Sequence, residues 1–221
     1  MIKNDYHHGN LKDTFLEIAL DFIKTDDIDN LTLKILSDKT GTSRSAIYRH
    51  FASRDALIET MIQGGFDDFD KKISPLLHDK SNSLIDRFYL AGKALIDFAI
   101  ENPNLYRLIF GKKYSHIREE LLSIEDEDCS GFSALKSAIE EGQQAGILKK
   151  EDSHQQTIVI WASLHGLASL IIDGFKDVEK ISSEVYDAMF KSLLAGLISN
   201  KIKLISTIPF INKILEPTHN S

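Results

Sequence analysis

The chain has 221 residues and a formal net charge of −7, with 43% apolar and 27% charged residues, an ordinary balance for a soluble globular protein. A single cysteine, Cys129, excludes an intrachain disulfide and favours a reducing compartment. The first residues include Asp and His where a secretory signal needs an apolar stretch. The longest nearly continuous apolar run, 158–172, is short for a membrane span and contains His165. We therefore expect a cytoplasmic protein that does not enter a membrane.

The beginning of the chain predicts a helix followed by a turn. Apolar residues recur at spacings of three and four through residues 10–24, which is the helical period. The polar stretch 25–30 then breaks the pattern with turn-forming aspartates and an asparagine. The apolar face of the first helix consists of Leu11, Phe15, Ile18 and Phe22.

Short polar residues mark the ends of the next two helices. Thr32 is placed to cap a helix over 32–39, and Gly41 can take the left-handed conformation that ends such a helix. Ser43 is the natural cap of a second short helix, 43–50. Two short helices joined by a glycine-containing turn have the spacing of a helix-turn-helix, whose second helix enters the DNA major groove.

The remainder of the chain is also predicted to be helical. Ser53 caps a longer helix, and a charged loop is expected at 125–128. The sequence therefore predicts an all-α chain of three parts: a helix-turn-helix head over 1–54, a larger helical bundle over 55–203 and a tail over 204–221. Within the bundle the expected helices cover approximately 53–73, 84–102, 105–110, 132–146, 153–173 and 182–203.

Positive charge is concentrated on the predicted helix-turn-helix although the whole chain is acidic. Residues 32–54 contain five cations and one anion. A basic patch on an acidic protein suits contact with a polyanion at one place only. The cations are Lys34, Lys39, Arg44, Arg49 and Arg54, and the anion is Asp38.

The stretch LTLKILSDKTGTSRSAIYRHFASRDALIETMI, residues 31–62, resembles the DNA-binding region of the TetR family of bacterial transcriptional regulators. Arg54 and Ser45 replace the Lys and Gly that are more common there, while WASLHGLASL at 161–170 resembles the Trp-His-Gly element of one subgroup of the family. The resemblance implies an all-helical homodimer in which a small molecule bound in the body changes the spacing of two DNA-binding heads. The residues that match the family pattern are Gly41, Thr42, Ser43, Ile47, Tyr48, His50 and Phe51.

Each predicted DNA contact follows from its position. Arg44 suits bidentate reading of a guanine, whereas Tyr48 and His50 suit phosphate, which positions the protein without specifying sequence. For Arg49 a DNA contact and a sideways, solvated position are equally good interpretations, and the alternative for the whole set is a solvated helix face. The predicted DNA-binding residues are Thr32, Lys34, Thr42, Ser43, Arg44, Ser45, Tyr48, Arg49, His50 and Arg54.

Two further groups of residues are candidates for ligand binding and dimerisation. Aromatic side chains of the body suit either a ligand pocket or the core. Apolar doublets near the C-terminus exceed what a monomer core needs, so they predict a four-helix interface between two subunits, with a monomer built around a central buried helix as the alternative. The pocket candidates are Phe88, Tyr89, Tyr106, Phe110, Phe132, Trp161 and His165. The predicted interface consists of Ile158, Val185, Tyr186, Met189, Phe190, Leu193, Leu194, Gly196 and Leu197.

Enzymatic motifs are weak in this sequence. A di-iron bundle needs two Glu-x-x-His pairs, and only Glu151 with His154 has that spacing. Lys112 lacks the upstream glycine of a phosphate-binding loop. We expect no cofactor and no metal, and a ligand-responsive regulator that a small-molecule effector releases from palindromic operator DNA, most simply a repressor. The alternative is a helical-bundle ligand-binding or enzymatic protein without sequence-specific DNA binding.

Overall fold

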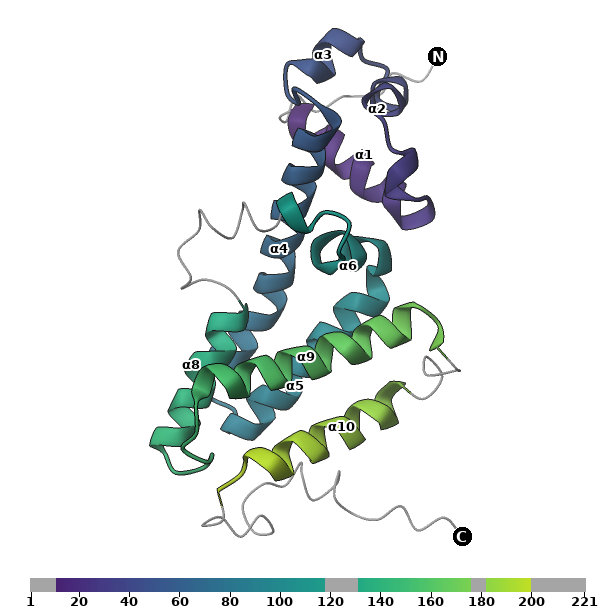
Figure 1. Ribbon diagram of the computed structural model, residues 1–221. Coiled ribbons are helices and arrows are strands. Elements are labelled where there is room, and N and C mark those ends of the chain that lie inside the picture. The colour runs from purple at the N-terminus through teal and green to yellow at the C-terminus, as the bar shows by residue number, and fades with distance from the viewer. Residues whose placement is uncertain (1–10, 118–130, 176–181, 200–221) are drawn as a thin grey trace. The chain divides into compact units, whose positions relative to one another are not determined.

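The computed structural model describes residues 11–117, 131–175 and 182–199 (Figure 1). These residues form helices, and they contain no strand beyond one isolated antiparallel bridge between Leu148 and Ile198. The predicted all-α fold is therefore confirmed. The segment before residue 11, the loop at 125–128, Cys129 and the tail over 204–221 lie outside the described residues.

The chain divides into two compact units. The first, here called the head unit, comprises residues 1–67 and 102–125, and the second, the body unit, comprises 68–101 and 126–221. The sequence placed the end of the head at residue 54 and assigned 102–125 to the body. The structural head unit is thus larger than the predicted one and is assembled from two separate stretches of chain.

The head unit contains the predicted helix-turn-helix with its caps. The Thr32 hydroxyl accepts a hydrogen bond from the amide of Ile35 at 3.2 Å. Gly41 ends the first of the two short helices at φ 65°, where a side chain would be strained. These caps were expected from the sequence and are confirmed. The helical elements are α1 (Leu11–Thr25), the 3₁₀ turn η1 (Ile28–Asn30), α2 (Leu33–Thr40), α3 (Arg44–Tyr48), the first part of α4 (Arg54–His78) and α6 (Pro103–Phe110).

Apolar side chains from α1 to α4 form the core of the head unit. Ile47 on α3 is 0% exposed and Phe51 just behind α3 is 1% exposed, so both anchor this short helix. Phe51 meets Phe15 of α1 edge to face, with ring centroids 6.5 Å apart. Burying a side chain of this size contributes about 1.5–3 kcal/mol, which compensates for the low intrinsic stability of a five-residue helix.

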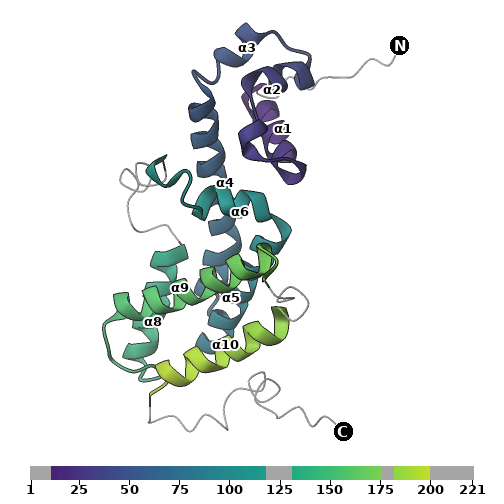
Figure 2. The same cartoon turned by 45° about the vertical axis from the view of Figure 1, so that its right-hand side comes forward.

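The body unit is a bundle of the second part of α4 with α5, α8, α9 and α10. Figure 2 shows α9 lying across α5 and beside α8. α9 is apolar and long enough to cross a membrane, which alone is weak evidence for a span. Its Leu164, Leu167 and Ala168 are buried within the bundle. The helices added by this unit are α5 (Leu84–Glu101), α8 (Gly131–Gln144), α9 (Ser153–Ile172) and α10 (Ser182–Leu197).

Candidate DNA-binding surface and ligand pocket

Helix α3 turns its apolar side into the head unit and its polar side outward. Ala46 and Ile47 are buried, whereas Tyr48 is 56% exposed although it carries a large aromatic ring. Figures 1 and 2 both show α3 at the end of the head unit that lies furthest from α6. The exposed polar residues of α3 and its flanks are Ser43, Arg44, Ser45, Arg49 and His50.

The polar residues of α3 differ in how much hydrogen-bonding capacity remains for a partner. The Ser43 hydroxyl accepts from the Ala46 amide at 3.2 Å, so it caps the helix as predicted. Arg49 donates from Nε to the Ser45 carbonyl at 3.4 Å, which places its guanidinium along its own helix. Within the described residues the side chain of Arg44 makes no hydrogen bond or ion pair, so its guanidinium donors can all face a ligand.

The residues flanking α3 occupy a range of environments. Thr32 and Lys34 are exposed at the start of α2, which suits contact with a phosphate backbone. The Thr42 hydroxyl is 2.8 Å from the Thr40 hydroxyl and only half exposed. His50 is exposed, but one side of its ring packs on Phe15 at a centroid distance of 5.9 Å.

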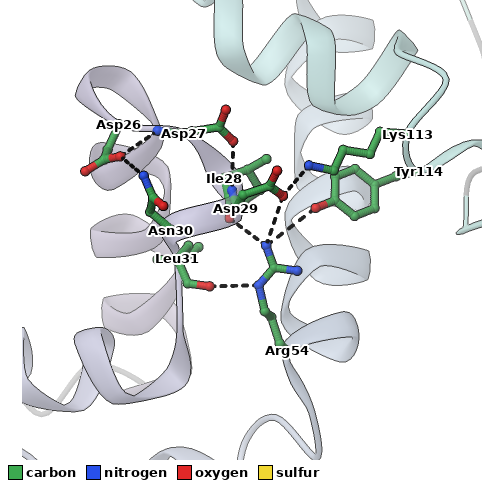
Figure 3. Close-up of polar contacts among 9 residues, drawn as sticks. All are labelled: Asp26, Asp27, Ile28, Asp29, Asn30, Leu31, Arg54, Lys113 and Tyr114. Atoms are coloured by element: carbon green, nitrogen blue, oxygen red, sulfur yellow. Dashed lines mark hydrogen bonds and ion pairs between the residues drawn. The ribbon is translucent and has the colours of Figure 1, made fainter.

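Arg54 occupies a different position from the one the sequence suggested. Figure 3 shows its guanidinium turned toward the connection between α1 and α2. Nε donates to the Leu31 carbonyl at 2.8 Å, and Nη2 donates to the Ile28 carbonyl at 2.6 Å. Nη2 also lies 3.5 Å from the Tyr114 hydroxyl and 3.9 Å from Asp29 Oδ1. This geometry is an internal brace, and it does not fit the predicted phosphate contact.

The same cluster explains why residues 102–125 belong to the head unit. Lys113 pairs with Asp29, and this hydrogen bond raises the pKa of Lys113 above its usual value (Figure 3). Asn104 Nδ2 on α6 donates to the carbonyl of Ile23 on α1 at 2.6 Å. α6 also packs so closely on α4 that a Cβ on Gly65 would lie 2.7 Å from the Ile109 side chain.

An apolar pocket opens within the body unit. The atom-free space in it, counted out to its open mouth and therefore including solvent there, is roughly 620 Å³. Helices α4, α5, α8, α9 and α10 all contribute to its wall. The lining residues are Ile73, Leu77, Phe88, Ala91, Gly92, Leu95, Gly131, Leu135, Ile160, Trp161, Leu164, Tyr186, Met189, Phe190, Leu193, Leu194 and Leu197.

The pocket contains two of the seven residues proposed for it from the sequence, Phe88 and Trp161. Tyr89, Phe132 and His165 lie behind the wall in ring contacts; the ring of His165, for example, is 4.6 Å from that of Trp161. The two remaining candidates, Tyr106 and Phe110, belong to the head unit and do not contribute.

The sequence missed the contribution of α10 to the pocket. Its doublets were assigned to the dimer interface, yet six of those nine residues line the pocket. The doublets could have suggested this, because a helix that is apolar over half its circumference can face a cavity as readily as a second subunit. The shared residues are Tyr186, Met189, Phe190, Leu193, Leu194 and Leu197.

Two tyrosines at one edge of the pocket, Tyr186 in the wall and Tyr89 behind it, have hydroxyls that are hydrogen-bonded within the chain. The Tyr186 hydroxyl donates to the Tyr89 carbonyl at 2.6 Å, and the Tyr89 hydroxyl donates to Asp187 Oδ1 at 2.8 Å. Burial, followed by the hydrogen bond to Asp187, raises the pKa of Tyr89 to about 12. Burial also raises the pKa of Tyr186 far above its usual value. Gly92 permits this arrangement, since a Cβ there would lie 2.6 Å from the Tyr186 oxygen.

The outward faces of α9 and α10 carry exposed apolar and small residues. Ile158 is 46% exposed, and the adjacent Val159 is 54% exposed. Gly166 and Gly196 point into open space, because an added Cβ would meet nothing within 4 Å. Within their own chain Tyr186 and Leu194 are only 3% and 5% exposed, so we leave both out of the interface. The exposed apolar and small residues are Ile158, Val159, Ala162, Gly166, Leu170, Ala188, Ala195 and Gly196.

The two short helices, their glycine turn and the exposed polar face of α3 place the head unit in the helix-turn-helix class. Comparison with protein families makes this specific: residues 15–61 match the bacterial regulatory proteins of the tetR family, and residues 88–197 match the tetracyclin repressor-like C-terminal domain. Together the two matches cover more than half of the chain, which belongs to the TetR family. The likeness of residues 161–170 to the Trp-His-Gly subgroup stays a prediction.

Among curated proteins the chain is similar to nucleoid occlusion factors. It is 28% identical to the factor SlmA of Aliivibrio fischeri strain MJ11 over 115 residues, covering 52% of this chain and 58% of that protein. With SlmA of Idiomarina loihiensis it shares 24% identity over 196 residues, covering 86% and 96% of the two chains. The chain thus spans little more than half the length of the first of these relatives.

The solved structures with similar folds include the following two. A protein of unknown function from Rhodococcus sp. RHA1 aligns with a TM-score of 0.74 and 25% identity, covering 89% of this chain and 100% of that one. The fatty acid degradation regulator FadR from Bacillus halodurans aligns with a TM-score of 0.66 over 86% and 97% of the two chains. At 14% identity the second match shows the fold alone.

Proposed function

We propose that the protein is a DNA-binding transcriptional regulator that places α3 in the major groove. The supporting observation is the exposed end of α3, where Arg44 keeps its donors unengaged among the described residues beside Ser45 and Tyr48. A guanidinium in this position can donate two hydrogen bonds to a guanine edge. Such a role would place the protein in the cytoplasm.

Each exposed side chain has a distinct part in the proposed complex. Arg44 reads a base, while Tyr48 and Lys34 contact phosphates on either side and fix the register of α3. Thr32 lies at the N-terminus of α2, where backbone amides of the first helical turn can donate hydrogen bonds to a phosphate. Arg54 is not among the proposed DNA contacts, because its donors are directed at the carbonyls of Ile28 and Leu31.

We further propose that two copies associate through the outward faces of α9 and α10. The exposed apolar residues of α9 and the small residues of α10 allow two helix pairs to approach closely and to exclude water. A dimer of helix-turn-helix proteins binds two half-sites about 34–36 Å apart, so the operator would be palindromic.

The pocket of the body unit is the proposed effector site. A ligand bound there can change operator affinity only by the difference in its affinity for the DNA-binding and non-binding conformations. Repression relieved by the ligand is the simplest outcome of such coupling.

The test is selection of duplexes from a random pool, followed by titration of the selected duplex over a range of salt concentrations. We expect a palindromic consensus and a steep fall in affinity with salt, because each neutralised phosphate contributes roughly −0.9 to the slope of log affinity against log salt. Lys34→Ala should reduce that slope by about one and leave the consensus unchanged. Failure to enrich any sequence with the ligand-free protein would contradict the proposal.

A further inference from the structure

We propose that the pocket of the body unit binds an uncharged, almost purely apolar molecule, such as a hydrocarbon chain or a fused ring system, and rejects close analogues that carry an ionic group. This inference rests on the effector role proposed above and specifies the chemistry of the effector. It follows from the lining of the pocket, from the polar groups at its edge and from its construction on five helices.

The lining offers a charged ligand no counter-charge. Every lining residue belongs to the described part of the chain, and none of them is Asp, Glu, Lys, Arg or His. A charge buried without a partner loses its hydration and gains nothing in return. An apolar molecule instead gains free energy roughly in proportion to the surface that it removes from water.

The two tyrosine hydroxyls nearest the pocket are already engaged by the protein. Tyr186 is the lining residue with a hydroxyl, and it donates that proton to the Tyr89 carbonyl. The Tyr89 hydroxyl in turn donates to Asp187, whose carboxylate is therefore occupied behind the wall. A ligand that needed either tyrosine as a donor would have to break a hydrogen bond that holds α5 to α10.

The side chains on the inner face of α10 form the part of the pocket wall that can change shape to fit a ligand. Three of its residues, Met189, Phe190 and Leu193, line the pocket and are only half buried, whereas Leu95 of α5 is 1% exposed. The end of α10 is held by backbone hydrogen bonds, Lys149 N to Leu197 O at 2.9 Å and Ser199 N to Ile147 O at 3.0 Å. Side chains of Met and Leu can change rotamer to fit different apolar shapes without adding polarity.

Two fluorescent probes with the same ring skeleton test the proposal. N-phenyl-1-naphthylamine is uncharged, and 1-anilinonaphthalene-8-sulfonate carries one negative charge on the same rings. Each is titrated into the full-length protein without DNA, so the result does not depend on the proposed regulatory function. We expect the neutral probe to bind at least about tenfold more tightly, because the sulfonate has no partner in the pocket. Equal affinities, or tighter binding of the sulfonate, would overturn the proposal, as would the absence of binding by the neutral probe.

Paired substitutions locate the bound probe. Leu164→Trp fills the pocket from α9 and should abolish binding of the neutral probe. Ser169→Trp introduces the same side chain on the same helix at an exposed position outside both the pocket lining and the residues of the proposed subunit surface, and it should leave binding intact. Loss of binding in both variants, or in neither, would place the probe elsewhere and overturn the proposal.

A positive charge placed in the pocket should reverse the preference for the neutral probe over the sulfonate. This test does not depend on whether Leu164→Trp folds. Met189→Lys puts an ammonium on the half-buried inner face of α10, so the sulfonate should gain affinity and the neutral probe should lose it. Ser192→Lys adds the same charge to the exposed side of α10 and should change neither affinity. A reversal produced equally by both variants would show a surface charge effect and contradict binding in the pocket.

Discussion

The same dipeptide, Ser-Arg, begins two helices of the head unit, and its two arginines have opposite fates. Ser43 and Ser53 each cap a helix, accepting from the amides of Ala46 and Ala56 at 3.2 and 3.1 Å. The arginine that follows Ser43 is exposed. The arginine that follows Ser53 is braced inside the unit on two carbonyls. Local sequence therefore determines where each helix starts, whereas it does not determine where the arginine points.

The difference between the two arginines comes from their neighbours. The turn η1 presents the carbonyls of Ile28 and Leu31 beside the start of α4, and a guanidinium can donate to both at once (Figure 3). Asp29 adds a negative charge 3.9 Å away. The start of α3 has no such acceptors among the described residues, so Arg44 remains available to a partner.

Of the changes that distinguish Arg44 from Arg54, Arg44→Ala is expected to have the largest effect, a loss of duplex affinity. Loss of one bidentate base contact costs about 1–3 kcal/mol, so affinity for the selected duplex should fall roughly 5- to 150-fold. The melting temperature should hardly change, because exposed side chains of this kind contribute within about ±0.5 kcal/mol to stability. Duplex titration and thermal denaturation of the same preparation check both parts. Unchanged duplex affinity would rule out Arg44 as a base contact.

The reverse pattern is expected for Arg54→Lys. One ammonium cannot donate to the Leu31 and Ile28 carbonyls in the geometry that the planar guanidinium provides, so about 1 kcal/mol of stability should be lost. The affinity for the selected duplex should stay as in the unsubstituted protein. Chemical denaturation measures the first quantity and a duplex titration the second, with Arg44→Lys as the matched control. A lower duplex affinity at unchanged stability would return Arg54 to the DNA contacts.

The contrast also shows which features a sequence can reveal. Thr32, Gly41 and Ser43 were predicted with their roles, because a cap depends on residues within one helical turn. Of the apolar face predicted for the first helix, only Phe15 is buried, because the buried stripe of α1 runs on through Ala19 and Ile23. The inward turn of Arg54 depends on carbonyls more than twenty positions away in the chain, which no local pattern reports.

The body unit shows the same limit on a larger scale. The apolar doublets of α10 were recognised and assigned to a second subunit, and six of those residues line a pocket in their own chain. Periodicity shows that a face is apolar and does not show what covers it. The membership of Asn104 and Lys113 in the head unit was equally hidden, since it depends on contacts with Ile23 and Asp29.

The smallest effect is expected for the two capping serines, Ser43 and Ser53. Their removal should lower the stability of the protein by similar amounts, although the two arginines that follow them differ in role. Ser43→Ala and Ser53→Ala each remove a helix cap, and each should cost about 1 kcal/mol of unfolding free energy. Only Ser43→Ala should also weaken duplex binding, because it loosens the helix that carries Arg44. The stability lost in the double variant Ser53→Ala with Arg54→Lys should differ from the sum of the two single losses, since both changes act on the first turn of α4. Strict additivity in that double variant would show that the cap and the brace act independently, and that the direction of Arg54 owes nothing to how firmly α4 begins.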